Sequence, residues 1–285
     1  MHHREGPRME SEAILVGRQN DPREIAVEAE RALDENEFFL VFQPKLRLET
    51  GLLSGFESLL RWRHPTYGLL MPSAFIDIVE NSPLSCRFTD FLLTEAAKTL
   101  ANWGARGYGD LSLSINLPSR EITQPGMAER LSAILDAHGI GADRLQIELT
   151  EATHPGPIDA LATAVDSLRE AGVSVAIDDF GSGCWSLSIL HRLAVDTLKL
   201  DRSFICNIDG SSEARAVVET LVRLGQALGK RIVMEGIETE AQFAWARTMT
   251  QIDCQGYYIS APVHDAQIDG LIAKHGIPPA VQDAD

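Results

Sequence analysis

The sequence predicts an α/β fold, a modified (β/α)8 TIM-like barrel with one antiparallel strand near the N-terminus. Eight strand-like segments alternate with helical stretches along the 285 residues, an order typical of parallel strands joined by crossover helices. The first two strand-like segments are separated only by "RLETGL", which suits a hairpin and leaves no room for a crossover helix. A doubly wound open sheet is the competing fold, but the sequence contains no glycine-rich phosphate loop that would support it.

The elements follow from short apolar runs and from apolar residues at helical spacing. In chain order, the expected strands are Phe38–Phe42, Gly55–Leu60, Leu111–Asn116, Leu145–Leu149, Val173–Asp178, Thr197–Asp201, Arg231–Glu235 and Gln255–Ile259. The first expected helix begins at Asp21, a capping residue followed by proline. The later expected helices are Pro72–Glu80, Thr89–Trp103, Met127–His138, Ile158–Ala171, Leu187–Leu193, Glu213–Leu228, Glu240–Arg247 and Ala266–Lys274.

The chain before the first expected helix differs in character from the rest. Residues 1–20 are polar and show no sustained period, so we interpret them as a linker or a tag-derived segment. Residues 21–285 then form one barrel domain, a size that such barrels commonly have. A linker at the start also suggests an upstream sensory or cyclase-like domain in the full-length protein.

Composition excludes several classes of protein. The formal net charge is −16, from 41 acidic and 25 basic residues, which disfavours binding to duplex nucleic acid. No apolar run approaches the roughly 20 residues of a membrane span, and no signal peptide is evident. The cysteines lack metal-binding spacing, so we expect mostly buried, reduced thiols and a cytoplasmic segment, although a parent protein anchored elsewhere is compatible with this. They are Cys86, Cys184, Cys206 and Cys254.

Polar side chains recur where the expected strands end. They are Glu57, Asn116, Glu148, Asp178, Asp179, Lys199, Asp201 and Glu235, and Gln255 opens the last expected strand. Taken one per strand, Glu148, Asp178, Lys199, Glu235 and Gln255 lie 20 to 36 residues apart, which is room for one helix, one strand and loops. In a closed barrel such positions converge on the carboxyl-terminal mouth, where the active sites of this fold lie.

Five of these side chains are carboxylates, and together they need positive charge. They are Glu57, Glu148, Asp178, Asp179 and Glu235. Lys199 would offset one negative charge and Arg61 one more, so the cluster predicts bound divalent cations. Oxygen donors without histidine or cysteine suit Mg²⁺ or Mn²⁺, with Ca²⁺ as a candidate inhibitor. The number of acids suits two ions about 3.5–4 Å apart.

The adjacent pair Asp178 and Asp179 raises a geometric question. Neighbouring strand residues point to opposite faces of a sheet, so both can serve one site only if the strand bends at its end. Gly181 and Gly183 follow directly and provide backbone freedom for such a bend. We therefore expect Asp178 to bridge the two ions.

Any one carboxylate at a strand end has a simpler interpretation. Such a residue often caps the next helix by accepting a hydrogen bond from a backbone N–H group. Asp201, before "RSF", and Glu151, before "ATHPGP", are good candidates for this role. The capping interpretation accounts poorly for five acids at one mouth, and that set carries the functional prediction.

The motifs resemble those of EAL-domain phosphodiesterases, bacterial signalling enzymes that hydrolyse cyclic di-GMP (c-di-GMP). The resemblance runs from about Glu24 to Pro262, and the naming triplet reads Glu57-Ser58-Leu59, with serine in place of alanine. The other matching blocks, in family order, are "QPK", "IN", "ELTE", "DDFGSG", "LKLDRSFI", "EGIET" and "QGYYIS". Each block alone is weakly specific, whereas their order makes the match strong. Residues 21–285 would then be an EAL-type barrel domain.

The resemblance implies a role for each matching residue. One ion would be held by Glu57, Asn116, Glu148 and Asp178, and the other by Asp178, Asp179 and Glu235. The catalytic residues would be Lys199, Glu235 and Asp178, with Lys199 helping to polarise the attacking water. Substrate-binding residues would be Gln43, Arg61, Asp201 and Gln255, while Glu151 would anchor the loop after "DDFG".

The implied reaction is hydrolysis of c-di-GMP to linear pGpG by a water that two metal ions activate. The family also implies a homodimer. Cys184 and Trp185 stand where tyrosine and serine are common, and Met234 stands where alanine is usual. These departures concern loop packing and space at the second metal site, and none removes an expected metal ligand.

Two alternatives belong to other functional classes. A catalytically inactive c-di-GMP receptor or regulatory domain would bind the ligand without hydrolysing it, but inactive members usually lack metal ligands, and here none is missing. A metal-dependent barrel enzyme of another reaction class, such as an enolising lyase, would use a lysine or histidine base near an acid cluster. The eight histidines lie in expected loops, termini or helices and lend this reading no support.

Overall fold

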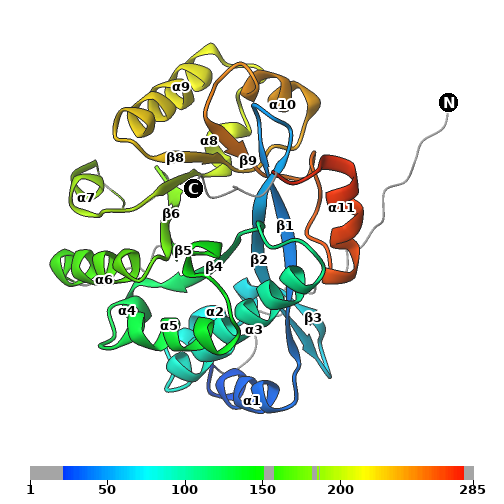
Figure 1. The fold of residues 1–285 in the computed structure, drawn as a ribbon, viewed down its shortest axis with the longest axis vertical. Coiled ribbons are helices and arrows are strands. Elements are labelled where there is room, and N and C mark those ends of the chain that lie inside the picture. The colour runs from blue at the N-terminus through cyan, green and yellow to red at the C-terminus, as the bar shows by residue number, and fades with distance from the viewer. Residues whose placement is uncertain (1–21, 151–156, 182–184, 186, 279–285) are drawn as a thin grey trace, which may run out of the picture. The chain divides into compact units, whose positions relative to one another are not determined.

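The computed structural model describes residues 22–150, 157–181, 185 and 187–278 (Figure 1). The chain divides into two compact units. One holds the chain up to Val41 together with Leu60–Phe91, and the other holds Phe42–Leu59 and the chain from Leu92 onward. In the described part of the chain, no helix combines the length and the apolar run needed to cross a membrane. The predicted boundary at residue 20 stays a prediction.

Strands of the second unit form a closed eight-stranded ring. The strands in this ring are β1 (Phe38–Arg47), β2 (Leu53–His64), β4 (Leu113–Pro118), β5 (Leu145–Thr150), β6 (Ser174–Phe180), β7 (Thr197–Leu200), β8 (Arg231–Met234) and β9 (Ile252–Cys254). The order is β1-β9-β8-β7-β6-β5-β4-β2, and pairing of β1 with β2 closes it. This confirms the predicted barrel. β1 and β2 begin or end in the first unit, as the division at Val41 and Leu60 requires.

One strand of the ring runs against the others. β1 pairs with β9 in antiparallel fashion, with Leu46 opposite Cys254, whereas each neighbouring pair from β2 and β4 around to β8 and β9 is parallel. The tight connection after β1 places the N–H of Arg47 2.9 Å from the carbonyl oxygen of Leu52. The antiparallel strand predicted from the short connection "RLETGL" is therefore confirmed.

The predicted position of the last strand is wrong. The final strand β9 covers Ile252–Cys254, and Gln255 follows it instead of opening a strand. A turn begins at Gly256, where a side-chain Cβ would lie 2.2 Å from the carbonyl oxygen of Ile237. The close approach of these two backbones ends the strand early. Gln255 consequently lies at the end of a strand, as the other polar residues of the predicted site do.

Helices of the second unit lie on the outer side of the parallel strands (Figure 1). Three of them are longer than ten residues and lie wholly in this unit: α5 (Met127–Ala137), α6 (Ile158–Glu170) and α9 (Ser212–Ala227). The shorter ones are α4 (Ser119–Ile122), α7 (Leu187–Arg192), α8 (Arg202–Ile205), α10 (Glu240–Ala246) and α11 (Ile268–His275), with 3₁₀ turns at Ala142–Arg144 and Asp265–Gln267. α3 (Ser85–Ala105) begins in the first unit and ends in this one.

The first unit has its own aromatic core. It contains α1 (Pro22–Asp34), α2 (Ile76–Glu80), the short strand β3 (Gly68–Leu70) and the 3₁₀ turn Pro72–Ala74. Phe38 packs on Trp62, Phe75 and Phe88 with ring centroids 4.9, 5.5 and 5.2 Å apart. Offset and edge-to-face contacts of this kind stabilise a core beyond the burial of apolar area.

The core of the second unit gathers around Trp103, which is fully buried. Its ring centroid lies 5.2 Å from that of Phe56 and 5.3 Å from that of Phe42. Trp103 Nε1 donates a 2.7 Å hydrogen bond to Asp265, so its polar atom is satisfied as well.

Three cysteines are free thiols, of which Cys254 is buried and Cys86 and Cys206 are exposed. The expectation of mostly buried thiols is wrong for the exposed pair, and Cys184 lies outside the described residues.

Candidate metal centre

The register of the parallel strands brings polar residues to one rim of the barrel. Glu57 is opposite Ser114, and Asn116 is opposite Glu148. Lys199 is opposite Val233, two residues before Glu235. Because parallel strands in register end together, side chains far apart in the sequence meet at the carboxyl ends of the strands. All of these residues belong to the second unit.

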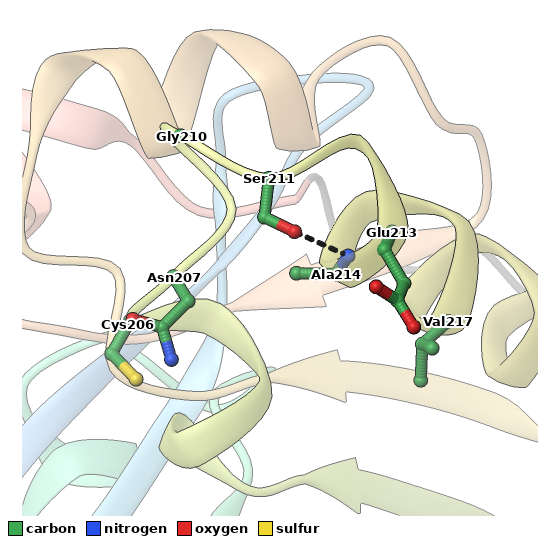
Figure 2. Close-up of a pocket in the computed structure, with 7 residues that line it drawn as sticks. All are labelled: Cys206, Asn207, Gly210, Ser211, Glu213, Ala214 and Val217. Atoms are coloured by element: carbon green, nitrogen blue, oxygen red, sulfur yellow. Dashed lines mark hydrogen bonds between the residues drawn. The ribbon is translucent and has the colours of Figure 1, made fainter.

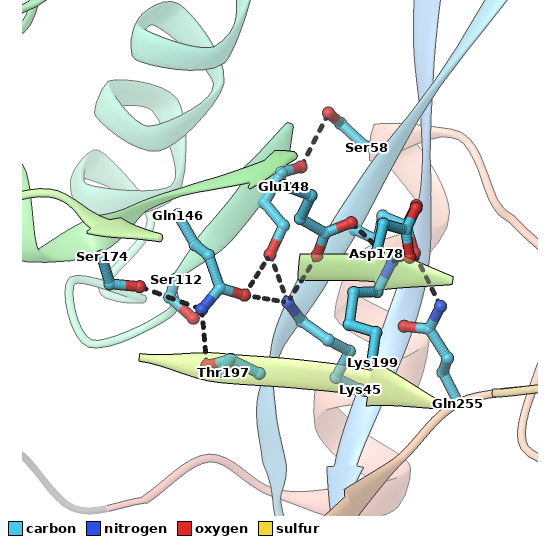
Figure 3. Close-up of polar contacts among 12 residues, drawn as sticks. Lys45, Ser58, Ser112, Gln146, Glu148, Ser174, Asp178, Thr197, Lys199 and Gln255 are labelled. Carbon is cyan, nitrogen blue, oxygen red and sulfur yellow. Dashed lines mark hydrogen bonds and ion pairs between the residues drawn. The ribbon is translucent and has the colours of Figure 1, made fainter. Parts of the chain in front are cut away.

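Lys199 lies at the centre of this rim with its side chain 1% exposed. Its ammonium nitrogen is 2.6 Å from Glu148 Oε2 and 2.8 Å from Asp178 Oδ1. It is also 2.8 Å from Glu235 Oε1 and 3.2 Å from Glu57 Oε2. Figure 3 shows the Lys199 side chain directed at this cluster beside Glu148 and Asp178. One ammonium therefore faces four carboxylates, which supports the predicted excess of negative charge.

Two amide side chains complete the contacts of Glu57. Asn116 Nδ2 donates to Glu57 Oε1 over 3.0 Å, and Gln255 Nε2 donates to Glu57 Oε2 over 2.6 Å. Gln255 Nε2 also lies 2.8 Å from Glu235 Oε1, so this one amide links two carboxylates. The nitrogen of each amide therefore donates to a carboxylate, and the amide oxygen remains available to another partner.

The end of β6 bends, as its sequence predicts. The register between β6 and β7 shifts between Ile177 and Phe180, as in a β-bulge. Asp179 has φ = 50°, a left-handed conformation that is uncommon for residues other than glycine. Its backbone N–H donates to Asp178 Oδ1 over 3.1 Å. The bend therefore lies at Asp179 itself, and it allows both aspartates to serve the same rim.

The carboxylates form two groups that could each hold a metal ion. Glu57, Glu148 and Asp178 make one group, and Asp178, Asp179 and Glu235 make the other. Within each group the candidate ligand atoms lie within 4.8 Å of one another. Asp178 belongs to both groups, which is the arrangement expected for a bridging carboxylate.

Three buried oxygen atoms test whether these residues suit a hard cation. Asn116 Oδ1, Glu148 Oε1 and Gln255 Oε1 accept no hydrogen bond from any part of the chain that the structure describes, although the ammonium of Lys45 lies 3.6 Å from Glu148 Oε1. Buried polar atoms without a hydrogen-bond partner are costly, and a bound ion or ordered water is their usual explanation. Carboxylate and amide oxygens are the ligands that Mg²⁺, Mn²⁺ and Ca²⁺ prefer. The residues present therefore fit divalent metal.

Burial and charge perturb the acids of the first group in opposite directions. Burial would raise the pKa of Glu57, but the ammonium of Lys199 and the amides of Gln255 and Asn116 lower it to about 2. Burial and the neighbouring charge of Glu57 raise the pKa of Glu148 to about 7, although Lys199 opposes the shift. Acids side by side with divergent pKa values are typical of functional sites.

The second group shows the same crowding. Burial and then the charges of Asp178 and Asp201 raise the pKa of Asp179 to about 6. Burial also keeps the pKa of Glu235 well above its usual range, because the attraction of Lys199 does not outweigh it. Burial would lower the pKa of Lys199, but the surrounding carboxylates, led by Asp178, hold it well above its usual range. The lysine therefore stays charged.

Asp201 has the capping role that its sequence context predicts. It precedes α8, and its side chain accepts a 3.0 Å hydrogen bond from the N–H of Ser203. Burial tends to raise the pKa of Asp201, but the hydrogen bonds from Ser203 and a hydrogen bond with Asp179 lower it. The same side chain thus caps a helix and contacts the second carboxylate group.

Lys45 is a further residue of the rim that was not predicted from the sequence. It lies in β1, is 5% exposed, and its ammonium nitrogen is 3.6 Å from Glu148 Oε1. The carboxylate of Glu148 therefore has a buried ammonium near each oxygen, Lys45 near Oε1 and Lys199 near Oε2 (Figure 3). The alternation of side chains along β1 could have indicated this position. Gln43 and Lys45 are two residues apart, so they face the same side of the strand.

The remaining predicted residues fall in different places. Gln43 is buried in β1 within the second unit, whereas Arg61 is buried in β2 within the first unit and donates to the carbonyl oxygen of Leu60 over 2.8 Å. Glu151 lies outside the described residues. The serine of the naming triplet, Ser58, is buried, and its hydroxyl donates to the carbonyl oxygen of Ser114 over 2.9 Å.

A separate cavity of about 630 Å³ lies between α8 and the start of α9, lined by side chains from Cys206 to Val217 (Figure 2). Figure 2 shows the hydroxyl of Ser211 directed at the N–H of Ala214, a 3.0 Å helix cap. The lining residues do not include the carboxylates of the rim. We therefore treat the rim, and not this cavity, as the candidate centre.

Comparison with known proteins agrees with this geometry. The family model of the EAL domain matches residues 26–262. The chain belongs to the EAL-domain family. This EAL chain is 34% identical over 240 residues to the cyclic di-GMP phosphodiesterase PA2567 of Pseudomonas aeruginosa, covering 84% of this chain and 41% of that protein. It is 33% identical over 246 residues to the bifunctional diguanylate cyclase/cyclic di-GMP phosphodiesterase MucR of the same organism, covering 85% and 36%.

The solved structures of related EAL domains are similar too. The structure of the PaMucR phosphodiesterase in complex with c-di-GMP has a TM-score of 0.80 and 32% identity, covering 86% of this chain and 99% of that chain. An EAL-domain protein from Listeria monocytogenes has a TM-score of 0.73 and 28% identity, covering 87% and 96%. The chain therefore matches whole solved EAL domains but less than half the length of MucR or PA2567.

Proposed function

We propose that this EAL domain hydrolyses c-di-GMP to linear pGpG with two divalent cations. The observation that carries the proposal is the pair of carboxylate groups sharing Asp178, found at the barrel rim of a chain of this family. Relatives that match most of this chain are named as cyclic di-GMP phosphodiesterases. A catalytically inactive receptor is less well supported, because all of the expected acids are present at the rim.

The two ions would be held by residues of the rim. Glu57, Asn116, Glu148 and Asp178 would hold one, and Asp178, Asp179 and Glu235 would hold the other. Bound Mg²⁺ or Mn²⁺ would supply Lewis acidity, making water a nucleophile near neutral pH and offsetting negative charge on the phosphodiester. We expect Ca²⁺ to inhibit, because it prefers more ligands at longer distances.

Lys199 would act on the reacting groups directly. Its ammonium lies 2.8 Å from Asp178 and 2.8 Å from Glu235, which are two members of the second carboxylate group. From there it would donate a hydrogen bond to the attacking water and stabilise negative charge that develops at phosphorus. Its raised pKa keeps the donor protonated throughout the neutral range.

Four polar residues would contact the substrate. Gln43 and Gln255 are buried polar residues of the second unit, and Gln255 already contacts two carboxylates of the rim. Arg61 would bind a phosphate of c-di-GMP, since a guanidinium matches the geometry of phosphate oxygens. Asp201, beside Asp179, would complete the pocket, and Glu151 would anchor the loop after β6.

The test is a hydrolysis assay. The protein is incubated with c-di-GMP and Mg²⁺ or Mn²⁺, and the nucleotides are separated by chromatography. We expect pGpG, and we expect Asp178→Asn to abolish both its formation and metal binding, while Glu95→Gln, on an exposed helix face, retains both. A folded wild-type protein that produces no pGpG with either ion would refute the proposal. Binding of c-di-GMP that is insensitive to chelator, without hydrolysis, would favour the receptor.

We also infer that the domain works within a larger assembly. The relatives MucR and PA2567 are more than twice as long as the segment that matches this chain, which supports an upstream sensory or cyclase-like domain. A homodimer is the expected state of the catalytic domain. Light scattering on purified protein should give twice the 31.2 kDa of the chain, and a monomer at catalytic concentrations would contradict this expectation.

A further inference from the structure

Lys45 belongs to a buried polar layer inside the barrel. Its ammonium lies 3.2 Å from Gln146 Oε1 and also hydrogen-bonds Ser114 Oγ. Gln146 Nε2 donates in turn to Ser174 Oγ over 2.9 Å and to Thr197 Oγ1 over 3.0 Å. Figure 3 shows this chain of contacts running from the strand hydroxyls through Gln146 to the lysine. Five strands of the ring therefore contribute to fixing the position of one ammonium group.

The fixed ammonium faces one acid of the proposed metal centre. Lys45 Nζ is 3.6 Å from Glu148 Oε1, while Lys199 Nζ is 2.6 Å from Glu148 Oε2. Glu148 is fully buried, so water does not solvate its carboxylate. Burying a carboxylate or an ammonium is costly unless the charge is paired. The pair thus gives each group a partner and restricts the rotation of the carboxylate.

The two lysines differ in what they contact. Lys199 touches members of both carboxylate groups. The ion pair of Lys45 is with Glu148, a member of the first group only. Replacing Lys45 and replacing Lys199 should therefore affect the binding of the two ions differently.

We propose that Lys45 is a positioning residue, which orients the carboxylate of Glu148 for one of the two metal ions. Gln146 and Ser114 hold the ammonium in place, and the ammonium orients the carboxylate. The inference rests on the proposed metal centre. Removing a residue that contacts and orients a metal ligand commonly weakens metal binding by about 10–100-fold. The loss should fall on the ion held by Glu57, Glu148 and Asp178.

The test is calorimetric titration with Mn²⁺ in the absence of nucleotide. The wild type should bind two ions, and Lys45→Met should bind one of them about 10–100-fold more weakly while the affinity for the other is unchanged. Lys45→Gln keeps a polar side chain toward Gln146 and Ser114, so it tests the same loss if the methionine variant does not fold. Lys98→Met, which removes an exposed lysine, is the matched control and should change neither affinity.

The outcomes separate this inference from the proposed function. Two unchanged affinities in a folded Lys45 variant would overturn the role of Lys45 and leave the proposed function intact. Equal weakening of both ions would also overturn it, because a merely structural role predicts a general effect. A wild type that binds no Mn²⁺ would overturn the proposed metal centre and this inference with it.

Discussion

Replacing Lys199 by methionine tests whether its ammonium balances the carboxylates of the rim. Methionine keeps an unbranched chain but has no charge, so Glu57, Glu148, Asp178 and Glu235 lose the cation that now lies 2.6–3.2 Å from them. Removing one partner of a buried ion pair typically costs about 3–5 kcal/mol of folding free energy. For a chain of 285 residues that corresponds to a fall in Tm of roughly 5–8 °C.

The size of the loss should depend on pH in a direction that the pKa values determine. Glu148 and Asp179, with pKa values raised to about 7 and about 6, contribute stability that is present at low pH and is lost as pH rises through those values. The ammonium of Lys199 is charged over this whole range. The deficit of Lys199→Met should therefore be largest near pH 8, where the carboxylates are ionised, and smaller at pH 5.

The assay is thermal and chemical unfolding of both proteins with chelator present, at pH 8 and pH 5. Saturating Mn²⁺ at pH 8 should also reduce the deficit, because the ions supply the missing positive charge. Lys98→Met is the matched control: its pair with Glu95 is exposed, and its loss should cost within about 1 kcal/mol. A Lys199→Met protein within about 1 kcal/mol of the wild type at pH 8 would refute the reasoning.

Three further predictions concern the same rim. Mn²⁺ should bind about tenfold more weakly at pH 6 than at pH 8, because protons compete for Glu148, with a pKa of about 7; equal affinities by calorimetry would contradict this. Asp179→Gly and Asp179→Ala should weaken the binding of one ion alike, but the alanine variant should be less stable by about 1–2 kcal/mol in denaturant, because φ is 50° there. Equal stabilities would show that the bend is not strained. Gly256→Ala should lower both Tm and hydrolysis, since its Cβ would lie 2.2 Å from a backbone oxygen and displace Gln255; Gly109→Ala, where the Cβ meets open space, should change neither.

Much of the architecture could be predicted from local patterns. Apolar runs and helical spacing depend on neighbouring residues, so the alternation of strands and helices was readable, as was the antiparallel strand after the short connection "RLETGL". The last strand was misplaced by three residues because the close approach of Gly256 to Ile237, which ends it, joins distant segments. The exposed Cys206 shows the same limit, since composition says nothing about which face a residue occupies.

For the candidate site, the sequence by itself determined which chemical groups stand at the strand ends: the acids, Asn116 and Lys199. Residue spacing and strand polarity are enough for that, because parallel strands joined by helices must end on the same rim. The tertiary structure alone decided that Lys199 contacts four carboxylates, that the bend predicted at the strand end lies at Asp179 itself, and that Lys45 lies beside Glu148 Oε1. Those facts depend on distances of a few ångströms between side chains from different strands, and such distances arise only when the ring closes.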